Sequence, residues 1–303
     1  MISFSLKDGT PIALGKNVIS RKKKKPIIIH IKENKEGYDP DINRELLKPK
    51  DFHYISSKDY EIILNALESG IVPKDENLRQ LFYLAEELIK KKMKSEIYEP
   101  DQLFTPIPKI DTRECIYVSG PSGSGKSTYV SKYALNYKKL FPDNPIYLIS
   151  RLGSDEVLDD IEDLHRIPIT EDITDYEVKS DELEDSLVIF DDVDTFQNKK
   201  VKEFVYNLID DLLQTGRHAN TYICVTSHLL TNSHKTRIIL NECHSVTLFP
   251  GRSTRHSLDY ILTKYFGLKK SQVGKLCQYH SRWITVYKNP PMCLYEKGCV
   301  LLR

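Results

Sequence analysis

The pattern of hydrophobic and polar positions changes near residue 110. Before that point, short apolar runs (Ile2 to Leu6 and Ile27 to Ile31) precede two helical patterns, at about Lys58 to Glu68 and Glu76 to Lys94. After it, short and nearly all-apolar segments alternate with helical ones. Strands that are apolar on both faces are typical of a parallel sheet that is covered by helices. We therefore expect an α/β fold after residue 110.

The apolar segments of this second part fix the expected order of its elements. The predicted strands are Cys115 to Ser119, Ile146 to Ser150, Leu187 to Phe190, Thr221 to Thr226 and Ser245 to Phe249. Between the third and the fourth, apolar residues recur at helical spacing from Val201 to Leu213, and Gly216 ends this amphipathic helix. The sequence thus predicts a mainly parallel sheet flanked by helices.

Three prolines divide the chain. Pro100, Pro106 and Pro108 interrupt helix continuation, so we place a linker there and expect two domains. These are a small α+β N-terminal accessory region (1–106) and an α/β domain (107–303). The 303 residues are 40% hydrophobic and 29% charged, which suits a globular protein and excludes disordered or collagen-like classes.

The expected location is intracellular. We find no apolar run of the roughly 18 residues that a membrane span needs, and no signal peptide. The six cysteines form no CxxC pair, so neither a zinc site nor a disulfide framework is indicated, and a reducing compartment suits them.

Charge is balanced in total and uneven along the chain. Lys and Arg number 44 and Asp and Glu 43, but residues 154–185 hold 14 acids and 2 bases, while residues 199–303 hold 16 bases and 6 acids. The basic last third could contact nucleic acid, or it could be a solvated surface that offsets the acidic stretch. The run Arg21 to Lys25 could likewise be a nuclear signal, a phosphate patch or a solvated turn.

A phosphate-binding loop is the strongest chemical signal. The segment from Gly120 to Ser127 matches GxxxxGK[ST] and lies between a predicted strand and a predicted helix, which is the context that this motif requires. A chance glycine-rich turn is the alternative. The expected nucleotide-binding residues are Gly120, Pro121, Ser122, Gly123, Ser124, Gly125, Lys126, Ser127 and Thr128. Backbone amides would bind phosphate oxygens, Lys126 the β and γ phosphates, and the Ser127 hydroxyl a magnesium ion.

A pair of acids ends the third predicted strand. Asp191 follows four apolar residues in the form of a Walker B strand and would hold the magnesium ion, while Asp192 would orient or deprotonate the attacking water. The alternative is two solvated acids that cap the next helix. We expect Asp194 to be a helix N-cap.

Polar residues at the end of the fourth strand are candidates for sensing the γ-phosphate. They are Thr226, Ser227 and His228, among which the sequence does not choose, and each could equally be a strand end that meets water. Arg217, just before this strand, could act as an arginine finger on a neighbouring subunit or pair with acids. Arg237, Arg252 and Arg255 are lesser candidates for a finger or for a DNA contact.

Taken in order, these motifs resemble the FtsK/HerA superfamily. The chain is most similar to the packaging ATPases of large double-stranded DNA viruses and virophages, and the resemblance rests on Gly120 to Ser127, Leu187 to Asp192 and Thr215 to His228. The segment Lys235 to Pro250 also resembles these proteins, and the likeness covers about residues 113–290. Many relatives have Glu where this chain has Asp192, and cellular translocases have a strand-end Gln where it has Ser227 or His228.

The resemblance implies an additional-strand (RecA/FtsK-like) P-loop NTPase that hydrolyses ATP with Mg²⁺. It also implies a homo-oligomeric ring that moves double-stranded DNA into a viral capsid, in the host cytoplasm or the virion, with capsid or portal-like proteins as partners. From the residues alone, the paired acids support nucleoside triphosphate hydrolysis. The alternatives are a nucleotide-gated scaffold or assembly ATPase without DNA translocation, and a kinase, against which we find no Arg-rich lid segment.

Overall fold

The computed structural model describes residues 2–4, 9–17, 27–31, 43, 44, 46–92, 95–169, 173, 180–230 and 234–302. The basic run Arg21 to Lys25 lies outside these residues, as does part of the acidic stretch. No helix among the described residues has the length and apolar character that crossing a membrane would require.

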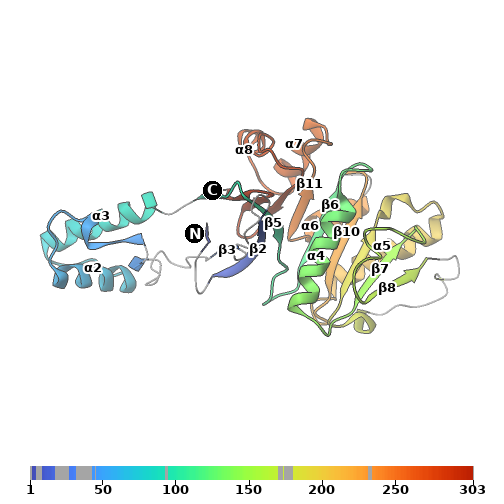
Figure 1. Cartoon of the computed structure of the whole chain (residues 1–303), viewed down its shortest axis with the longest axis horizontal. Coiled ribbons are helices and arrows are strands. Elements are labelled where there is room, and N and C mark those ends of the chain that lie inside the picture. The colour runs from blue at the N-terminus through green and yellow to red at the C-terminus, as the bar shows by residue number, and fades with distance from the viewer. Residues whose placement is uncertain are drawn as a thin grey trace.

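A ten-stranded sheet forms the centre of the protein (Figure 1). Its strands lie in the order β4-β14-β13-β12-β11-β6-β10-β9-β7-β8. The six from β11 to β8 are parallel, and they are β11 (Ser245–Leu248), β6 (Cys115–Ser119), β10 (Tyr222–Ser227), β9 (Leu187–Asp191), β7 (Ile146–Ser150) and β8 (Leu164–Pro168). The other four are antiparallel, and they are β12 (Ile284–Tyr287), β13 (Met292–Tyr295), β14 (Gly298–Leu301) and β4 (Glu96–Tyr98).

The strand order confirms the expected fold class. β10 lies between β6, which precedes the glycine-rich loop, and β9, which ends in the acid pair. An extra strand inserted between these two is what defines an additional-strand P-loop NTPase. All five predicted parallel strands are present within one residue of their expected bounds. Every residue of β6, β9 and β10 is buried, as their unbroken apolar sequences indicate.

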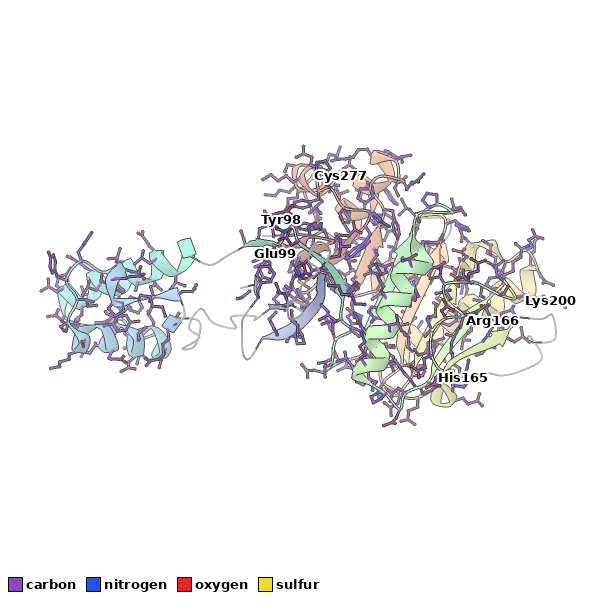
Figure 2. All side chains as sticks on the ribbon, viewed as in Figure 1. Tyr98, Glu99, His165, Arg166, Lys200 and Cys277 are labelled. Carbon is purple, nitrogen blue, oxygen red and sulfur yellow. The ribbon has the colours of Figure 1, made fainter. Side chains whose placement is uncertain are left out.

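Helices cover both faces of this sheet. α4 (Lys126–Leu140) packs on one face, with Val130, Ala134 and Tyr137 in a core shared with Ile116 and Leu148. The other face is covered by α5 (Lys199–Gln214), α6 (His234–Glu242), α7 (Arg255–Lys264) and α8 (Lys270–Leu276), which contribute to a second core. The side chains of His165 and Arg166 mark the β8 edge in Figure 2.

A smaller antiparallel sheet lies against the α4 side. Its order is β1-β3-β2-β5, and its strands are β1 (Ile2–Ser3), β3 (Ile28–Ile31), β2 (Thr10–Asn17) and β5 (Gln102–Pro106). Asn136 on α4 donates hydrogen bonds to Thr105 and to the Pro106 carbonyl at 3.2 and 2.8 Å. The expected linker around Pro100 and Pro106 is therefore wrong for this segment, because residues 96–98 extend the large sheet and residues 102–106 the small one.

Two helices form a separate unit at one end of the molecule (Figure 1). α2 (Ser57–Ser69) and α3 (Glu76–Lys92) pack together, with the short helix η1 (Pro49–Asp51) nearby, around their own apolar core that includes Leu64 and Phe82. Ser56 caps α2 by accepting a hydrogen bond from the Asp59 amide, and Gly70 ends it in the left-handed conformation. Both helices were expected from the sequence, and the structure confirms their helical periodicity.

Candidate nucleotide-binding and hydrolytic site

The segment from Gly120 to Gly125 joins β6 to α4 as a tight loop. Gly123 and Gly125 have φ angles of 71° and 104°, which glycine adopts without steric cost. A Cβ on Gly120 would lie 2.6 Å from the Phe249 ring, so only glycine fits there. The Gly120 amide donates to the Ser227 carbonyl at 3.1 Å, which fixes the loop to the end of β10. This geometry leaves the N-terminus of α4 facing the loop, where its amides can bind an anion.

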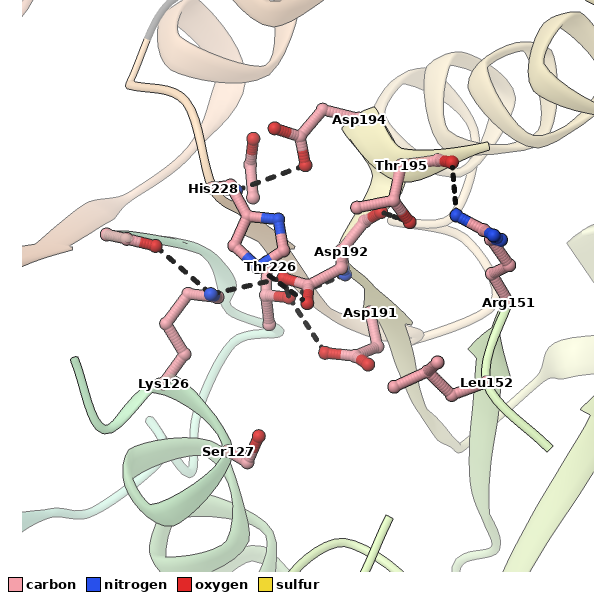
Figure 3. Close-up of polar contacts among 12 residues, drawn as sticks. Lys126, Ser127, Arg151, Leu152, Asp191, Asp192, Asp194, Thr195, Thr226 and His228 are labelled. Atoms are coloured by element: carbon pink, nitrogen blue, oxygen red, sulfur yellow. Dashed lines mark hydrogen bonds and ion pairs between the residues drawn. The ribbon is translucent and has the colours of Figure 1, made fainter. Parts of the chain in front are cut away.

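Lys126 supplies a buried cation at this helix N-terminus (Figure 3). The residue is 6% exposed, and its Nζ donates to the Gly120 carbonyl at 3.0 Å. The same Nζ lies 3.3 Å from Asp192 Oδ1. The loop lysine and the acid that follows β9 are therefore in direct contact.

Asp191 is buried at the carboxyl end of β9 and is held by two hydroxyls. Ser150 donates to its Oδ2 at 3.1 Å and Thr226 to its Oδ1 at 2.9 Å. Burial and the neighbouring charge of Asp192 raise the pKa of Asp191. A buried carboxylate with this environment fits a hard divalent cation, which would offset both effects and accept oxygen ligands.

Ser127 does not donate to Asp191 among the described contacts. Its hydroxyl donates instead to Asp155 Oδ2 at 3.3 Å. The other oxygen of Asp155 accepts the amides of Val157 and Leu158, each at 2.9 Å, so the carboxylate is fixed in the turn after β7. The charge of Asp155 also contributes to the raised pKa of Asp191.

Sequence analysis did not select Asp155. It lies in a stretch of 14 acids, in which one functional carboxylate does not stand out from solvated ones. Its position just after a predicted parallel strand was the available signal, because the carboxyl ends of all such strands meet at one edge of the sheet.

Asp192 takes a left-handed backbone conformation, with φ 47° and ψ 51°. Its amide donates to the Thr226 hydroxyl at 2.7 Å, and its Oδ2 lies 3.2 Å from His228 Nε2. A non-glycine residue in this conformation is uncommon and is held here by its contacts. The carboxylate is turned toward Lys126 and His228 and is not a helix cap (Figure 3).

The structure separates the three candidates for the γ-phosphate sensor. Thr226 bridges both acids, since its hydroxyl lies 2.9 Å from Asp191 Oδ1 and 3.2 Å from Asp192 Oδ1. His228 contacts Asp192, whereas Ser227 donates its hydroxyl to the Leu229 carbonyl at 3.0 Å. Thr226 and His228 are thus brought to the acid pair, and the Ser227 side chain is engaged elsewhere.

The expected N-cap role of Asp194 is wrong. Asn198 caps α5, accepting from the Lys200 amide at 2.9 Å. Asp194 instead accepts the amides of His228 and Leu229, at 3.1 and 3.0 Å, and so anchors the segment after β10 to the short helix η4 (Val193–Thr195). This contact positions the His228 ring beside Asp192.

A cavity of about 550 Å³ opens beside the loop. The loop and α4 form one wall, and Phe249, Arg252, Arg282, Trp283 and Glu296 form the rest. Trp283 packs edge-on against Tyr129 with ring centroids 5.0 Å apart, and the Arg282 amide donates to Glu296 at 2.7 Å. The cavity is large enough for a nucleoside and combines apolar rings with both signs of charge. Its C-terminal wall was not anticipated from the sequence.

The four candidate arginines lie in different places. Arg217 precedes β10, while the glycine-rich loop follows β6, and these parallel strands place the two at opposite edges of the sheet. Arg217 therefore does not reach the loop of its own chain. Arg237 is exposed on α6, and Arg252 lines the cavity. Arg255 donates to Asp259 at 3.0 Å and to the Lys270 carbonyl at 3.3 Å, so it joins α7 to α8.

Comparison with known proteins gives one strong sequence relative. The chain is 44% identical to the uncharacterised protein V3 of Sputnik virophage over 214 residues, which are 70% of this chain and 86% of that protein. No family model matches the chain.

Solved structures show more distant similarity. The genome packaging NTPase B204 from Sulfolobus turreted icosahedral virus 2, in complex with AMPPCP, is 14% identical, with a TM-score of 0.42 over 61% of this chain and 97% of that one. The pCW3 conjugation coupling protein TcpA with ATPγS is 10% identical, with a TM-score of 0.46 over 98% of this chain and 87% of that one. The strand order is that of an additional-strand P-loop NTPase, and the chain belongs to the same family as protein V3 of Sputnik virophage.

Proposed function

We propose that the protein is a magnesium-dependent ATPase that moves double-stranded DNA during packaging of a viral genome. One observation carries the hydrolytic part of this proposal. Lys126 at the start of α4 lies 3.3 Å from Asp192, and Thr226 bridges Asp192 to the buried Asp191. A phosphate-binding cation, a metal-binding acid and a second acid thus meet at one edge of the sheet.

In the proposed hydrolysis, each residue of the site has a separate role. Lys126 and the amides from Gly120 to Thr128 bind the β and γ phosphates, while the cavity beside the loop takes the nucleoside. Ser127 and Asp191 hold Mg²⁺, which neutralises charge on the phosphate oxygens. Asp192 orients the attacking water and accepts its proton, and Thr226 fixes the separation of the two acids.

His228 is positioned to report on the γ-phosphate. Its Nε2 lies 3.2 Å from Asp192 Oδ2, and its amide is fixed by Asp194. A phosphate that binds Lys126 competes with Asp192 for that cation, so the Asp192 carboxylate and its contact with His228 respond to nucleotide. We assign the sensor role to Thr226 and His228 together.

The DNA-moving part of the proposal rests on the sequence resemblance and on the basic last third of the chain. Residues 199–303 carry 16 bases and 6 acids, as contact with phosphates requires. A homo-oligomeric ring, in which Arg217 completes the site of a neighbouring subunit, agrees with the position of Arg217 at the edge opposite its own loop. Residues 107–303 form the motor in this proposal and residues 1–106 the accessory region, with capsid or portal-like partners in the host cytoplasm or the virion.

The test is steady-state ATP hydrolysis by the purified full chain with and without long duplex DNA. We expect magnesium-dependent hydrolysis that rises with DNA, and we expect Lys126→Ala to abolish it. Lys139→Ala, on the exposed last turn of the same helix, is the matched control and should behave as wild type. Hydrolysis that is confined to one turnover and indifferent to DNA would contradict translocation and favour a nucleotide-gated scaffold. Absence of both nucleotide binding and hydrolysis would reject the ATPase itself.

A further inference from the structure

A pair of helices projects from the same edge of the sheet as the glycine-rich loop (Figure 1). α7 and α8 connect β11 to β12, and they are held to the molecule by buried residues of their inner faces, among them Leu258, Ile261 and Val273. Their outer faces are exposed. Cys277, which ends α8, marks this part of the molecule in Figure 2.

The charge of this region is strongly one-sided. Between Glu242 and Glu296 the sequence has eight Lys or Arg residues and a single acid, Asp259. The exposed bases of the two helices and their connections are Arg252, Arg255, Lys264, Lys269, Lys270 and Lys275. Asp259 is already paired with Arg255 at 3.0 Å, so it does not neutralise the lysines. In a chain with 44 bases and 43 acids, this is a local concentration of positive charge.

The fold brings these bases together. Arg255 at the start of α7 donates to the carbonyl of Lys270 at the start of α8, at 3.3 Å. A Cβ on Gly274 would lie only 3.5 Å from the Arg255 guanidinium, so the two helices are in close contact beside Lys275. Lys269 and Lys270 are consecutive at the first turn of α8. The two helices that carry these cations are therefore in contact, and we call their exposed bases together the α7–α8 basic surface.

This surface is connected to the nucleotide cavity by a short turn. Leu248, the last residue of β11, pairs with Ser119, after which the glycine-rich loop begins. The amides of Arg252 and Ser253 donate to the Phe249 carbonyl, and Arg252 lines the cavity two residues before α7 is capped by Thr254. Only Ser253 and Thr254 therefore separate this residue of the cavity wall from the start of α7.

We propose that the α7–α8 basic surface binds the phosphate backbone of duplex DNA. The inference rests on the proposed function, which it deepens by assigning the DNA contact to these two helices. Duplex DNA carries about one negative charge per 1.7 Å of axis, so clustered cations without interspersed acids release several counterions on binding. Backbone contacts of this kind fix the position of the duplex without reading its sequence. The proposed DNA contact lies next to the cavity beside the glycine-rich loop, which suits a protein that couples ATP hydrolysis to the movement of DNA.

The experiment compares two triple variants of the full chain. The first, Lys269→Glu/Lys270→Glu/Lys275→Glu, reverses the charge of α8. The matched control, Lys58→Glu/Lys74→Glu/Lys139→Glu, changes the net charge equally at exposed lysines of α2, the α2–α3 connection and α4. The affinity for a long duplex is measured at several salt concentrations. The α8 variant should bind at least tenfold more weakly, and its slope of log affinity against log salt should fall by about 0.9 for each phosphate that the variant no longer neutralises.

Each outcome bears on one of the two proposals. Equal DNA affinity and salt slope in both triple variants would overturn the assignment to α7 and α8 and leave the ATPase proposal standing. DNA binding that depends on α8, in a protein whose hydrolysis ignores DNA, would support the surface and reject translocation. If wild type binds anionic lipid vesicles and no duplex, the surface is not a DNA contact. Misfolding is excluded by measuring the thermal midpoint and the ATP hydrolysis without DNA for every variant. A variant with Gln at the same three positions of α8 repeats the test with a smaller change of charge.

Discussion

Lys126 and Asp192 form an ion pair across the phosphate site, with 3.3 Å between Nζ and Oδ1. Their side chains are only 7% and 20% exposed, so the pair is shielded from solvent. In the proposed mechanism, a bound triphosphate would compete with Asp192 for Lys126. This competition would link occupancy of the loop to the position of the Asp192 carboxylate.

The Asp192→Asn variant should bind ATP and fail to turn it over. Loss of the acid that orients and deprotonates water should lower the hydrolysis rate by about 10²- to 10⁴-fold. Nucleotide affinity should be unchanged or higher, because Lys126 no longer has an anionic competitor. Phosphate release and equilibrium binding of a fluorescent ATP analogue measure the two effects. Asp160→Asn, an exposed acid outside the site, is the control, and a variant that loses binding as well would contradict the role given to Asp192.

The Asp155→Asn variant should need more magnesium. Asp155 accepts a hydrogen bond from the Ser127 hydroxyl, which would orient the oxygen lone pairs of Ser127 toward the proposed magnesium ion. Supporting contacts of this type typically contribute about 10- to 100-fold to metal affinity. Nucleotide binding titrated with Mg²⁺ should show a shifted midpoint, with little change in the binding measured without metal.

Glu156→Gln, which alters the adjacent exposed acid, is the matched control for Asp155. A midpoint that is the same in Asp155→Asn and Glu156→Gln would mean that the contact with Ser127 has no bearing on the metal. Because binding is measured directly, this experiment does not depend on hydrolysis.

The Arg217→Ala variant should lose hydrolysis and regain part of it on mixing with Asp192→Asn. Arginine fingers contribute about 10³- to 10⁵-fold to the rate in phosphoryl-transfer enzymes. Arg217 does not reach its own loop, so one of the two kinds of mixed interface would combine an intact arginine with an intact acid, while the other kind would lack both. Titration of one variant into the other, followed by phosphate release, measures the rescue. His218→Ala, at the neighbouring exposed position, controls for local structural damage. Full activity of Arg217→Ala alone would contradict the role of Arg217 as an arginine finger.

His244 should make the fold sensitive to acid. Its Nδ1 accepts the Cys115 amide at 2.9 Å, and burial, assisted by the charges of Lys109 and Arg113, lowers the pKa of His244 to about 4 from 6.5. His244 is protonated at a higher pH in the unfolded chain than in the folded one. The free energy of unfolding therefore decreases as the pH falls from about 6.5 to 4. We expect the thermal midpoint of His244→Asn to fall less between pH 7 and pH 5 than that of wild type. Parallel pH profiles would show that His244 makes no such contribution.

The parallel part of the large sheet was predictable from the sequence because its central strands are buried on both faces. β6 and β7 have the predicted bounds, and the loop and the acid pair lie where their strands end. The strands β12 to β14 were missed because they are short and follow one another without intervening helices, so they lack the alternation of strands and helices on which the prediction relied. The position of these strands also places Trp283 in the wall of the cavity, and no local sequence pattern predicts this placement.

Interactions between distant segments account for the remaining differences at the site. Asp194 precedes a helix by a spacing that suits a cap, but its carboxylate meets the amides of His228 and Leu229, more than thirty residues away in sequence. The choice between Thr226 and Ser227 was likewise open, because alternation along a strand does not say which face meets Asp191.

The chain leaves the small sheet after β3 and enters the large sheet at β4, and the helices α2 and α3, which lie between these strands in sequence, belong to neither sheet. β3 pairs with β1, and β1 in turn contacts β4, so the points of departure and entry are neighbours in space. The α2–α3 pair has its own apolar core and is inserted in sequence between two strands that lie close together. We therefore expect that the α2–α3 pair can be exchanged or shortened while both sheets and the glycine-rich loop are retained.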